Sequence, residues 1–300
     1  GCHSRSGRIS LSYGGLAEVR GAGLQACEVT QELPDGRTVC RLERDVHNAA
    51  GMACVDCHLH TELMGDGTSW GHQEQALEIT CRACHGPGAA ETTWSAIDDP
   101  ITTSILGLRK QPRAPEERVR IGARGTPLWN LRPSEHAPAT SGQDGPIPPT
   151  GWTLLRKLDG SQLAVPPTPT DAAHGLAGHE RITCDACHAS WAASCPDCHT
   201  RFDPEGEQWD FGAAAVQPGA WVETADHFGV APPALAVFGE RIVPAIPGMI
   251  ARLEAGTSRE RRLYARASPH TTGRGRACAS CHRAPWTLSL GSGSLSIEDG

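Results

Sequence analysis

Five short segments of the sequence carry two cysteines and a histidine at one fixed spacing, Cys-x-x-Cys-His. This is the attachment sequence of haem c. Two thiols add across the two vinyl groups of one porphyrin, and the next imidazole reaches the iron from the same side as its proximal ligand. The predicted attachment residues are Cys54, Cys57, Cys81, Cys84, Cys184, Cys187, Cys195, Cys198, Cys278 and Cys281. The predicted proximal ligands are His58, His85, His188, His199 and His282.

Zinc is the alternative interpretation of these cysteine pairs. CxxC is also half of a zinc site, and the pairs at 184/187 and 195/198 are spaced as in a zinc ribbon. A zinc site does not require a histidine directly after each pair. Here histidine follows all five pairs, although only 14 of the 300 residues are histidine. The pattern therefore favours haem c.

Cys2-His3 matches the end of a sixth motif whose first cysteine would precede Gly1. A lipoprotein cleavage site also ends in Gly-Cys, but cleavage there would remove Gly1. We therefore expect Cys2 and His3 to belong to a sixth haem site.

Cys27 and Cys40 lie outside all of these motifs. Between them, Asp35-Gly36 is a turn signal with strand-forming residues on each side, which predicts a hairpin. A disulfide across this hairpin would suit the oxidising compartment in which haem c is attached. The alternative is two unrelated thiols.

The remaining histidines are candidates for the distal axial ligands. Six haems with two histidines each need six more, and eight are available. Five of them lie five to ten residues before a motif, namely His47, His72, His174, His179 and His270. We expect a distal histidine to serve a haem other than the one attached just after it. His136 and His227 are further candidates, and His60 is the eighth histidine.

The composition excludes several classes of protein. The net charge of −7 argues against a general nucleic-acid binder, and no apolar run is long enough for a transmembrane helix. Phe, Tyr and Met total only nine residues, whereas Gly and Pro total 57. We therefore expect a mostly irregular, haem-packed fold with short α-helices and a few β-hairpins, in which each motif lies at the start of a helix or in a loop. Five arginines near the motifs are candidate partners of haem propionates, namely Arg5, Arg8, Arg82, Arg181 and Arg276.

Three regions are predicted along the chain. Residues 1–100 would hold two or three haems, residues 101–170 would form a haem-free, Pro-rich β spacer, and residues 171–300 would hold three haems. A hairpin turning at Asp159-Gly160 is expected within the spacer. Short helices are expected near Met249–Leu253 and over 257–266.

These motifs resemble those of bacterial multihaem c-type cytochromes, over residues 2 to 282 apart from 101–170. The resemblance implies a multihaem cytochrome c architecture, haem attachment outside the cytoplasm, and electron transfer along closely spaced haems. The implied partners are other redox proteins, or copies of this chain in a cell-surface or filament-forming conduit. No catalytic residue is assigned. The alternative is a multihaem reductase of nitrogen or sulfur oxyanions, which would need one iron with an open position.

Overall fold

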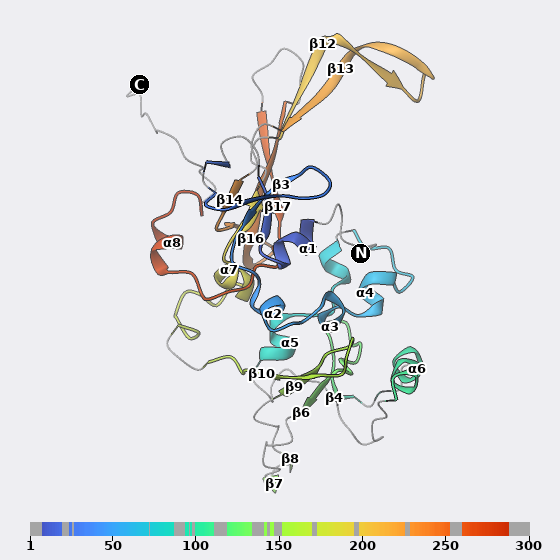
Figure 1. Cartoon of the computed structure of the whole chain (residues 1–300), viewed down its shortest axis with the longest axis vertical. Helices are drawn as coiled ribbons and strands as arrows, with labels where there is room; N and C mark the ends of the chain where they lie inside the picture. Colours follow the sequence, from blue (N-terminus) through green and yellow to red (C-terminus); the bar gives the residue numbers. More distant parts are fainter. Residues whose placement is uncertain are drawn as a thin grey trace. The chain divides into compact units, whose positions relative to one another are not determined.

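The chain divides into two compact units. The computed structural model describes residues 8–19, 24–25, 27–71, 73–86, 94–95, 97, 100–110, 119–133, 141–142, 145–146, 152–169, 173–194, 198–225, 229–252 and 260–287 (Figure 1). Unit 1 combines residues 1–49 with 178–300, and unit 2 is the intervening segment 50–177. Each unit is described by itself below.

Unit 2 is built from short helices and three small antiparallel sheets. Its helices are α3 (Cys54–Cys57), α4 (His60–Met64), a 3₁₀-helix (Gln73–Ala76), α5 (Cys81–His85) and α6 (Pro100–Leu108). Its strands are β4 (Trp94–Ser95), β5 (Val119–Arg120), β6 (Leu131–Pro133), β7 (Ser141–Gly142), β8 (Gly145–Pro146), β9 (Trp152–Leu155) and β10 (Gln162–Val165). The sheets are β10-β9-β6, β4-β5 and β7-β8.

The hairpin predicted around Asp159-Gly160 is confirmed. β9 and β10 pair antiparallel with Leu155 opposite Gln162, and Gly160 turns the chain with a φ of 75°. A positive φ is a conformation that glycine adopts at little cost.

The core of unit 2 joins the predicted spacer to the first two motifs. Its buried members are Leu59, Leu128, Leu131, Trp152 and Leu154, and Ala83 and Cys84 of α5 pack against them. The sequence suggested that residues 101–170 form a separate region. In the structure they belong to the same compact unit as the first two complete motifs. The sheet formed by residues 101–170 packs against α5 and against Leu59, which follows the first motif, so the predicted boundary at residue 100 falls inside a compact unit.

Unit 1 brings together both ends of the chain. Its helices are α1 (Arg8–Tyr13), α2 (Val46–Ala49), α7 (Cys184–His188) and α8 (Cys278–His282). Its strands are β1 (Leu16–Glu18), β2 (Thr30–Glu32), β3 (Thr38–Arg41), β11 (Ala192–Ser194), β12 (Cys198–Asp210), β13 (Ala215–Ala225), β14 (Gly229–Ala231), β15 (Ala234–Phe238), β16 (Arg241–Arg252) and β17 (Glu260–Arg266). β1-β3-β2 and β11-β14 form small sheets, and β13-β12-β16-β15 forms a larger one in which β17 also pairs with β16. Figure 1 shows β12 and β13 as a long hairpin.

The predicted disulfide between Cys27 and Cys40 is confirmed, with a Cα–Cα distance of 5.7 Å. It lies across the hairpin of β2 and β3, in which Thr30 faces Cys40 and Glu32 faces Thr38. Gly36 has a φ of 81° at the turn, as the Asp-Gly signal predicts.

The paired substitution Cys27→Ser and Cys40→Ser is expected to lower the free energy of unfolding by about 3 kcal/mol, because the bond closes a loop of roughly this size in the unfolded chain. Equilibrium unfolding in urea, followed by far-ultraviolet circular dichroism, measures the change. Thr30→Ser on the same hairpin is the control and should leave the transition in place. Equal transitions for both variants would contradict the expected contribution.

Two predicted helices are strands instead. Residues 241–252 form β16, which includes residues 249–252 of the segment expected to be helical, and residue 253 lies outside the described ranges. Residues 260–266, within the second expected helix, form β17 and pair with β16 from Ala245 to Arg252. β16 pairs with its chain neighbours β15 and β17 and, in parallel, with β12, and these hydrogen bonds between strands outweigh the local pattern that suggested helices.

The helices that the structure describes are short, as expected, and the longest of them is α6, with nine residues. Across the described ranges, no helix has both the length and the apolar character needed to cross a membrane.

Candidate haem-attachment sites

Four of the five complete motifs each form one short helix, as predicted. Cys54, Cys81, Cys184 and Cys278 are the first residues of α3, α5, α7 and α8. The residue before each helix has extended backbone angles, so the helix begins at the first cysteine. A separation of three residues places both cysteines on one helical face. In each pair the first cysteine is exposed and the second is partly buried, and none of the eight is in a disulfide.

The fifth motif differs from the other four. Cys198 and His199 begin β12, where His199 pairs with Thr224 of β13 and Ile250 of β16. The prediction that every motif starts a helix or lies in a loop is therefore wrong for this one. The structure describes only the backbone of these two residues, and Cys195 lies outside the described ranges.

Three of the predicted proximal histidines are oriented by a hydrogen bond from Nδ1. His58 Nδ1 lies 2.7 Å from Glu62 Oε2, His85 Nδ1 lies 2.8 Å from the Pro166 carbonyl, and His188 Nδ1 lies 3.0 Å from the Gly273 carbonyl. A carbonyl or carboxylate acceptor requires Nδ1 to carry the proton, which leaves Nε2 as the nitrogen that can coordinate a metal. This donor set fits haem c.

The buried carboxylate of Glu62 accepts several hydrogen bonds beside the first motif. Its carboxylate also accepts hydrogen bonds from the backbone N–H groups of Leu59, Glu78 and Ile79. Burial raises the pKa of Glu62, but the hydrogen bonds from His58 and these N–H groups outweigh it and hold the pKa below its ordinary value. The residue therefore keeps its negative charge and fixes the His58 ring.

A cation lies at the carboxyl end of three attachment helices. Lys157 Nζ donates to the His58 carbonyl at 3.2 Å, next to α3. Arg120 donates to the Ala83 carbonyl of α5 at 2.6 Å, and Arg276 donates to the Ser280 carbonyl of α8 at 3.0 Å. Positive charge is favourable at a helix C-terminus, where carbonyls lack helical partners. Of these three residues, the sequence analysis singled out only Arg276, and for a different role.

Two of the predicted propionate partners bind backbone carbonyls instead. Arg276 binds those of Pro233 and Ser280, and Arg181 binds that of Glu240 at 2.6 Å. Among the described residues, Nε of Arg120, Arg132 and Arg156 is buried without a hydrogen-bond partner. All three lie in unit 2.

Three of the predicted distal ligands occupy defined positions in unit 1. His47 Nδ1 lies 2.9 Å from Asp45 Oδ1, and His270 Nδ1 lies 2.7 Å from the Ser268 carbonyl. His270 also has a φ of 56°, a left-handed conformation that is costly for a non-glycine residue. The ring of His179 lies 5.9 Å from the ring of His282, between centroids, at an interplanar angle of 65°.

The other candidates are placed less fully. His174 is exposed in a turn of unit 2, and His60 is the first residue of α4. Outside the described ranges lie Cys2, His3, His72, His136 and His227.

Asp45 is a buried acceptor beside His47 that no sequence motif indicates. It is 2 % exposed and accepts hydrogen bonds from the backbone N–H groups of His47 and Thr272, at 2.8 and 2.6 Å. Thr272 adjoins Gly273, whose carbonyl binds His188, so Asp45 joins the His47 segment to the α7 site. Burial raises the pKa of Asp45, but hydrogen bonds from His47 and Thr272 bring it below its ordinary value.

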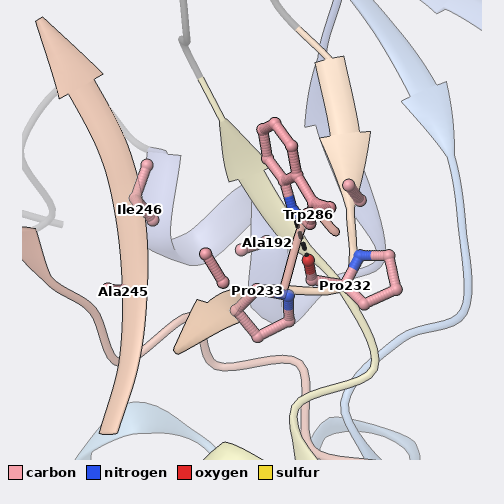
Figure 2. Close-up of a pocket in the computed structure, with 8 residues that line it drawn as sticks. Ala192, Pro232, Pro233, Ala245, Ile246 and Trp286 are labelled. Atoms are coloured by element: carbon pink, nitrogen blue, oxygen red, sulfur yellow. Dashed lines mark hydrogen bonds between the residues drawn. The ribbon is translucent and has the colours of Figure 1, made fainter. Parts of the chain in front are cut away.

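Figure 2 shows an apolar pocket in unit 1 that has no titratable side chain. Trp286, Pro232, Pro233 and Ile246 line it together with four alanines, and Trp286 Nε1 donates to the Pro232 carbonyl at 2.8 Å. The pocket offers no acid, base or nucleophile, and it anchors the loop that follows α8. Across the described residues, no group of three or more His, Cys, Asp or Glu is placed to hold a bare metal ion.

No family model, curated protein or solved structure matches this chain. A functional assignment therefore depends on the motifs and their local geometry.

Proposed function

We propose that this chain is a multihaem c-type cytochrome that carries electrons through five or six haems. The observation that carries the proposal is the shared geometry of the described motifs. Each places two cysteines on one helical turn, and in three of them the following histidine is oriented through Nδ1. The resemblance to multihaem cytochromes supports the same conclusion.

In this proposal the residues of the motifs and their neighbours have three roles, which are covalent attachment, axial ligation and orientation of the ligand rings. The cysteine pairs of α3, α5, α7 and α8 would form the thioether bonds, with the histidine that follows each pair as proximal ligand. His47, His179 and His270 would supply distal imidazoles in unit 1. Haem c, when bound with two histidines, supplies a low-potential one-electron couple. The acceptors Glu62, Pro166 and Gly273 hold the ligand rings, which limits rearrangement when the charge at the iron changes.

The disulfide supports a location outside the cytoplasm. Disulfides persist in oxidising compartments and are rare in the reducing cytosol. Cys27 and Cys40 are bonded, while the cysteine pairs of α3, α5, α7 and α8 are not. We accordingly propose that the protein acts in the periplasm or at the cell surface and exchanges electrons with other redox proteins, or with copies of itself.

The purified protein, produced in a host that attaches haem c, tests this function by two measurements. A pyridine haemochrome assay is expected to find at least five covalent haems per chain, and electron paramagnetic resonance of the oxidised protein should find all of them low-spin. Serine at both Cys184 and Cys187 should remove one haem, whereas Ser268→Ala should remove none. Bound zinc with no covalent haem would refute the proposal. A high-spin haem in the unmodified protein would instead favour a reductase with an open iron.

A further inference from the structure

His179 and His282 face each other although they are far apart in the sequence. Their ring centroids are 5.9 Å apart, and their planes are inclined by 65°. His282 is the predicted proximal ligand of the α8 motif, whereas His179 precedes the α7 motif by five residues. Their separation can be compared with the spacing that one shared iron would impose.

Two arrangements give a distance of this size. A metal–imidazole bond of about 2 Å on each side of one ion, plus about 1 Å from each nitrogen to its ring centre, places two trans rings about 6 Å apart. A direct edge-to-face contact of two aromatic rings spans about 4.5–7 Å. Distance alone does not separate these cases, so the position of each backbone segment decides between them.

The segment after His179 is fixed on the first residues of β16. The N–H of Ile182 binds the His179 carbonyl, and Ile182 forms a parallel bridge with Ile242. Thr183 N–H donates to the Ile242 carbonyl at 2.9 Å, and Ile242 N–H donates to the Arg181 carbonyl at 2.8 Å. The backbone around His179 is therefore positioned by the sheet.

The segment that carries His282 is fixed on the neighbouring strand. Arg276 donates to the Pro233 carbonyl, Trp286 to the Pro232 carbonyl (Figure 2), and the Leu235 N–H to the Thr287 carbonyl. β15, which begins at Ala234, is paired with β16, and Phe238 faces Arg241. Two adjacent strands thus hold the two histidines opposite each other independently of any contact between the rings.

We propose that His179 is the distal axial ligand of the haem attached at Cys278 and Cys281, with His282 as its proximal ligand. This inference rests on the proposed function. It deepens that function by assigning one ligand pair and one haem neighbour. Since His179 lies in the segment that leads into α7, the haems of α7 and α8 must be adjacent.

A second connection between α7 and α8 agrees with this pairing. Gly273 binds His188 of α7 at both its N–H and its carbonyl, and the Arg276 N–H donates to the Cys187 carbonyl at 2.9 Å. The guanidinium of the same Arg276 binds α8 through the Ser280 carbonyl. The chain therefore crosses between the two sites twice, and the histidine before each motif need not serve that motif.

The test uses the holoprotein and the spin state of its ferric haems. His179→Ala is expected to convert one haem per chain from low-spin to high-spin without changing the haem content. Added imidazole should restore the low-spin state, which a purely structural loss would not allow. Glu180→Ala is the matched control, because it alters the adjacent side chain without removing an imidazole, and all haems should stay low-spin. An all-low-spin His179→Ala protein would overturn the pairing.

A second variant assigns the affected iron. Cys278→Ala combined with Cys281→Ala should lack one haem, and adding His179→Ala to it should create no high-spin haem, because the iron concerned is gone. A high-spin haem in this triple variant shows that His179 serves another iron and overturns the pairing, while the proposed function stands. A wild-type chain without covalent haem instead defeats the proposed function.

If the double cysteine variant does not accumulate, His179→Met in the otherwise intact protein provides a further check. Methionine in place of an axial histidine raises the reduction potential of the haem it ligates. A spectroelectrochemical titration should therefore find one haem shifted upward and the others unchanged. Unchanged potentials at every haem would overturn the pairing.

Discussion

Substituting Arg120 by methionine is expected to lower the free energy of unfolding of unit 2 by about 3 kcal/mol, because several partly buried carbonyls lose a charged donor at once. Arg120 is 1 % exposed, and its guanidinium donates to the carbonyls of Arg82, Ala83, Cys84 and Gly86. These are the last carbonyls of α5 and of the residue that follows it. Methionine fills a similar volume, so the change isolates the polar contacts from packing.

The position of the guanidinium explains why one side chain has this effect. It lies 4.3 Å from the ring centre of Trp152, which belongs to the core of unit 2. Burial lowers the pKa of Arg120, so the charge is held there against a desolvation cost. The hydrogen bonds to α5 and the contact with the ring offset that cost.

Urea unfolding of the holoprotein, followed by far-ultraviolet circular dichroism, measures this loss. Arg41→Met is the matched control, because Arg41 is exposed and donates to one side chain, that of Gln31. Arg120→Lys should fall between the two, since lysine keeps the charge but cannot reach the same set of carbonyls. Equal stability of the two methionine variants would show that Arg120 does not hold α5 in place.

Local features of the fold could be predicted from the sequence. Asp35-Gly36 and Asp159-Gly160 each marked a hairpin, because the turn residues alone select that geometry. The first cysteine of a motif marked a helix start in all four motifs whose structure is described in full. These features depend on residues that are neighbours in the chain.

Features that depend on pairing between strands were not predictable in the same way. β16 contains Pro244 and Pro247 and looks irregular in isolation, yet it pairs with its chain neighbours β15 and β17 and with the more distant β12. The strand conformation at Cys198 likewise arises from β13 and β16. Tertiary hydrogen bonds outweigh local propensity at these positions.

The same distinction applies to the candidate sites. The predicted attachment cysteines and proximal histidines follow from the spacing of the motifs alone. Asp45 accepts a hydrogen bond from the Thr272 N–H, 227 residues away in sequence, and Lys157 donates one to the His58 carbonyl, 99 residues away. No local sequence pattern could connect these residues. The positions of Lys157, Arg120 and Arg276 also follow from the tertiary fold. A helix C-terminus interacts favourably with any cationic side chain that lies near it, whatever its position in the sequence.

Asp56→Ala is expected to lower the free energy of unfolding of unit 2 by about 3 kcal/mol, because it leaves the backbone N–H groups of Ala53 and Lys157 without their acceptor at a buried site. Asp56 lies between the two cysteines of the first motif and is 2 % exposed. One carboxylate oxygen accepts the Ala53 N–H at 2.7 Å, at the start of α3, and the other accepts the Lys157 N–H. The side chain thus joins the start of this helix to the turn after β9.

The ammonium group of Lys157 makes the loss larger than that of a helix cap alone. Burial lowers the pKa of Lys157 to about 8, and negative charge at Asp56 and Glu62 works against that effect. Nζ lies 5.5 Å from the ring centre of Trp129 and donates to the His58 carbonyl. Without Asp56 the ammonium group keeps its desolvation cost and loses one of its two compensating carboxylates, so α3 and β9 lose a connection that apolar contacts do not replace.

Asp56→Asn separates the two effects. Asparagine keeps an oxygen that can accept the Ala53 N–H but removes the charge, so the loss should be smaller than for alanine. Asp159→Ala is the control, because Asp159 is exposed and lies in the turn between β9 and β10. Urea unfolding gives the stabilities, and the haem content of each variant shows whether attachment at Cys54 and Cys57 survives. Equal losses for Asp56→Ala and Asp159→Ala would contradict the buried Asp56 carboxylate as the connection between α3 and the sheet.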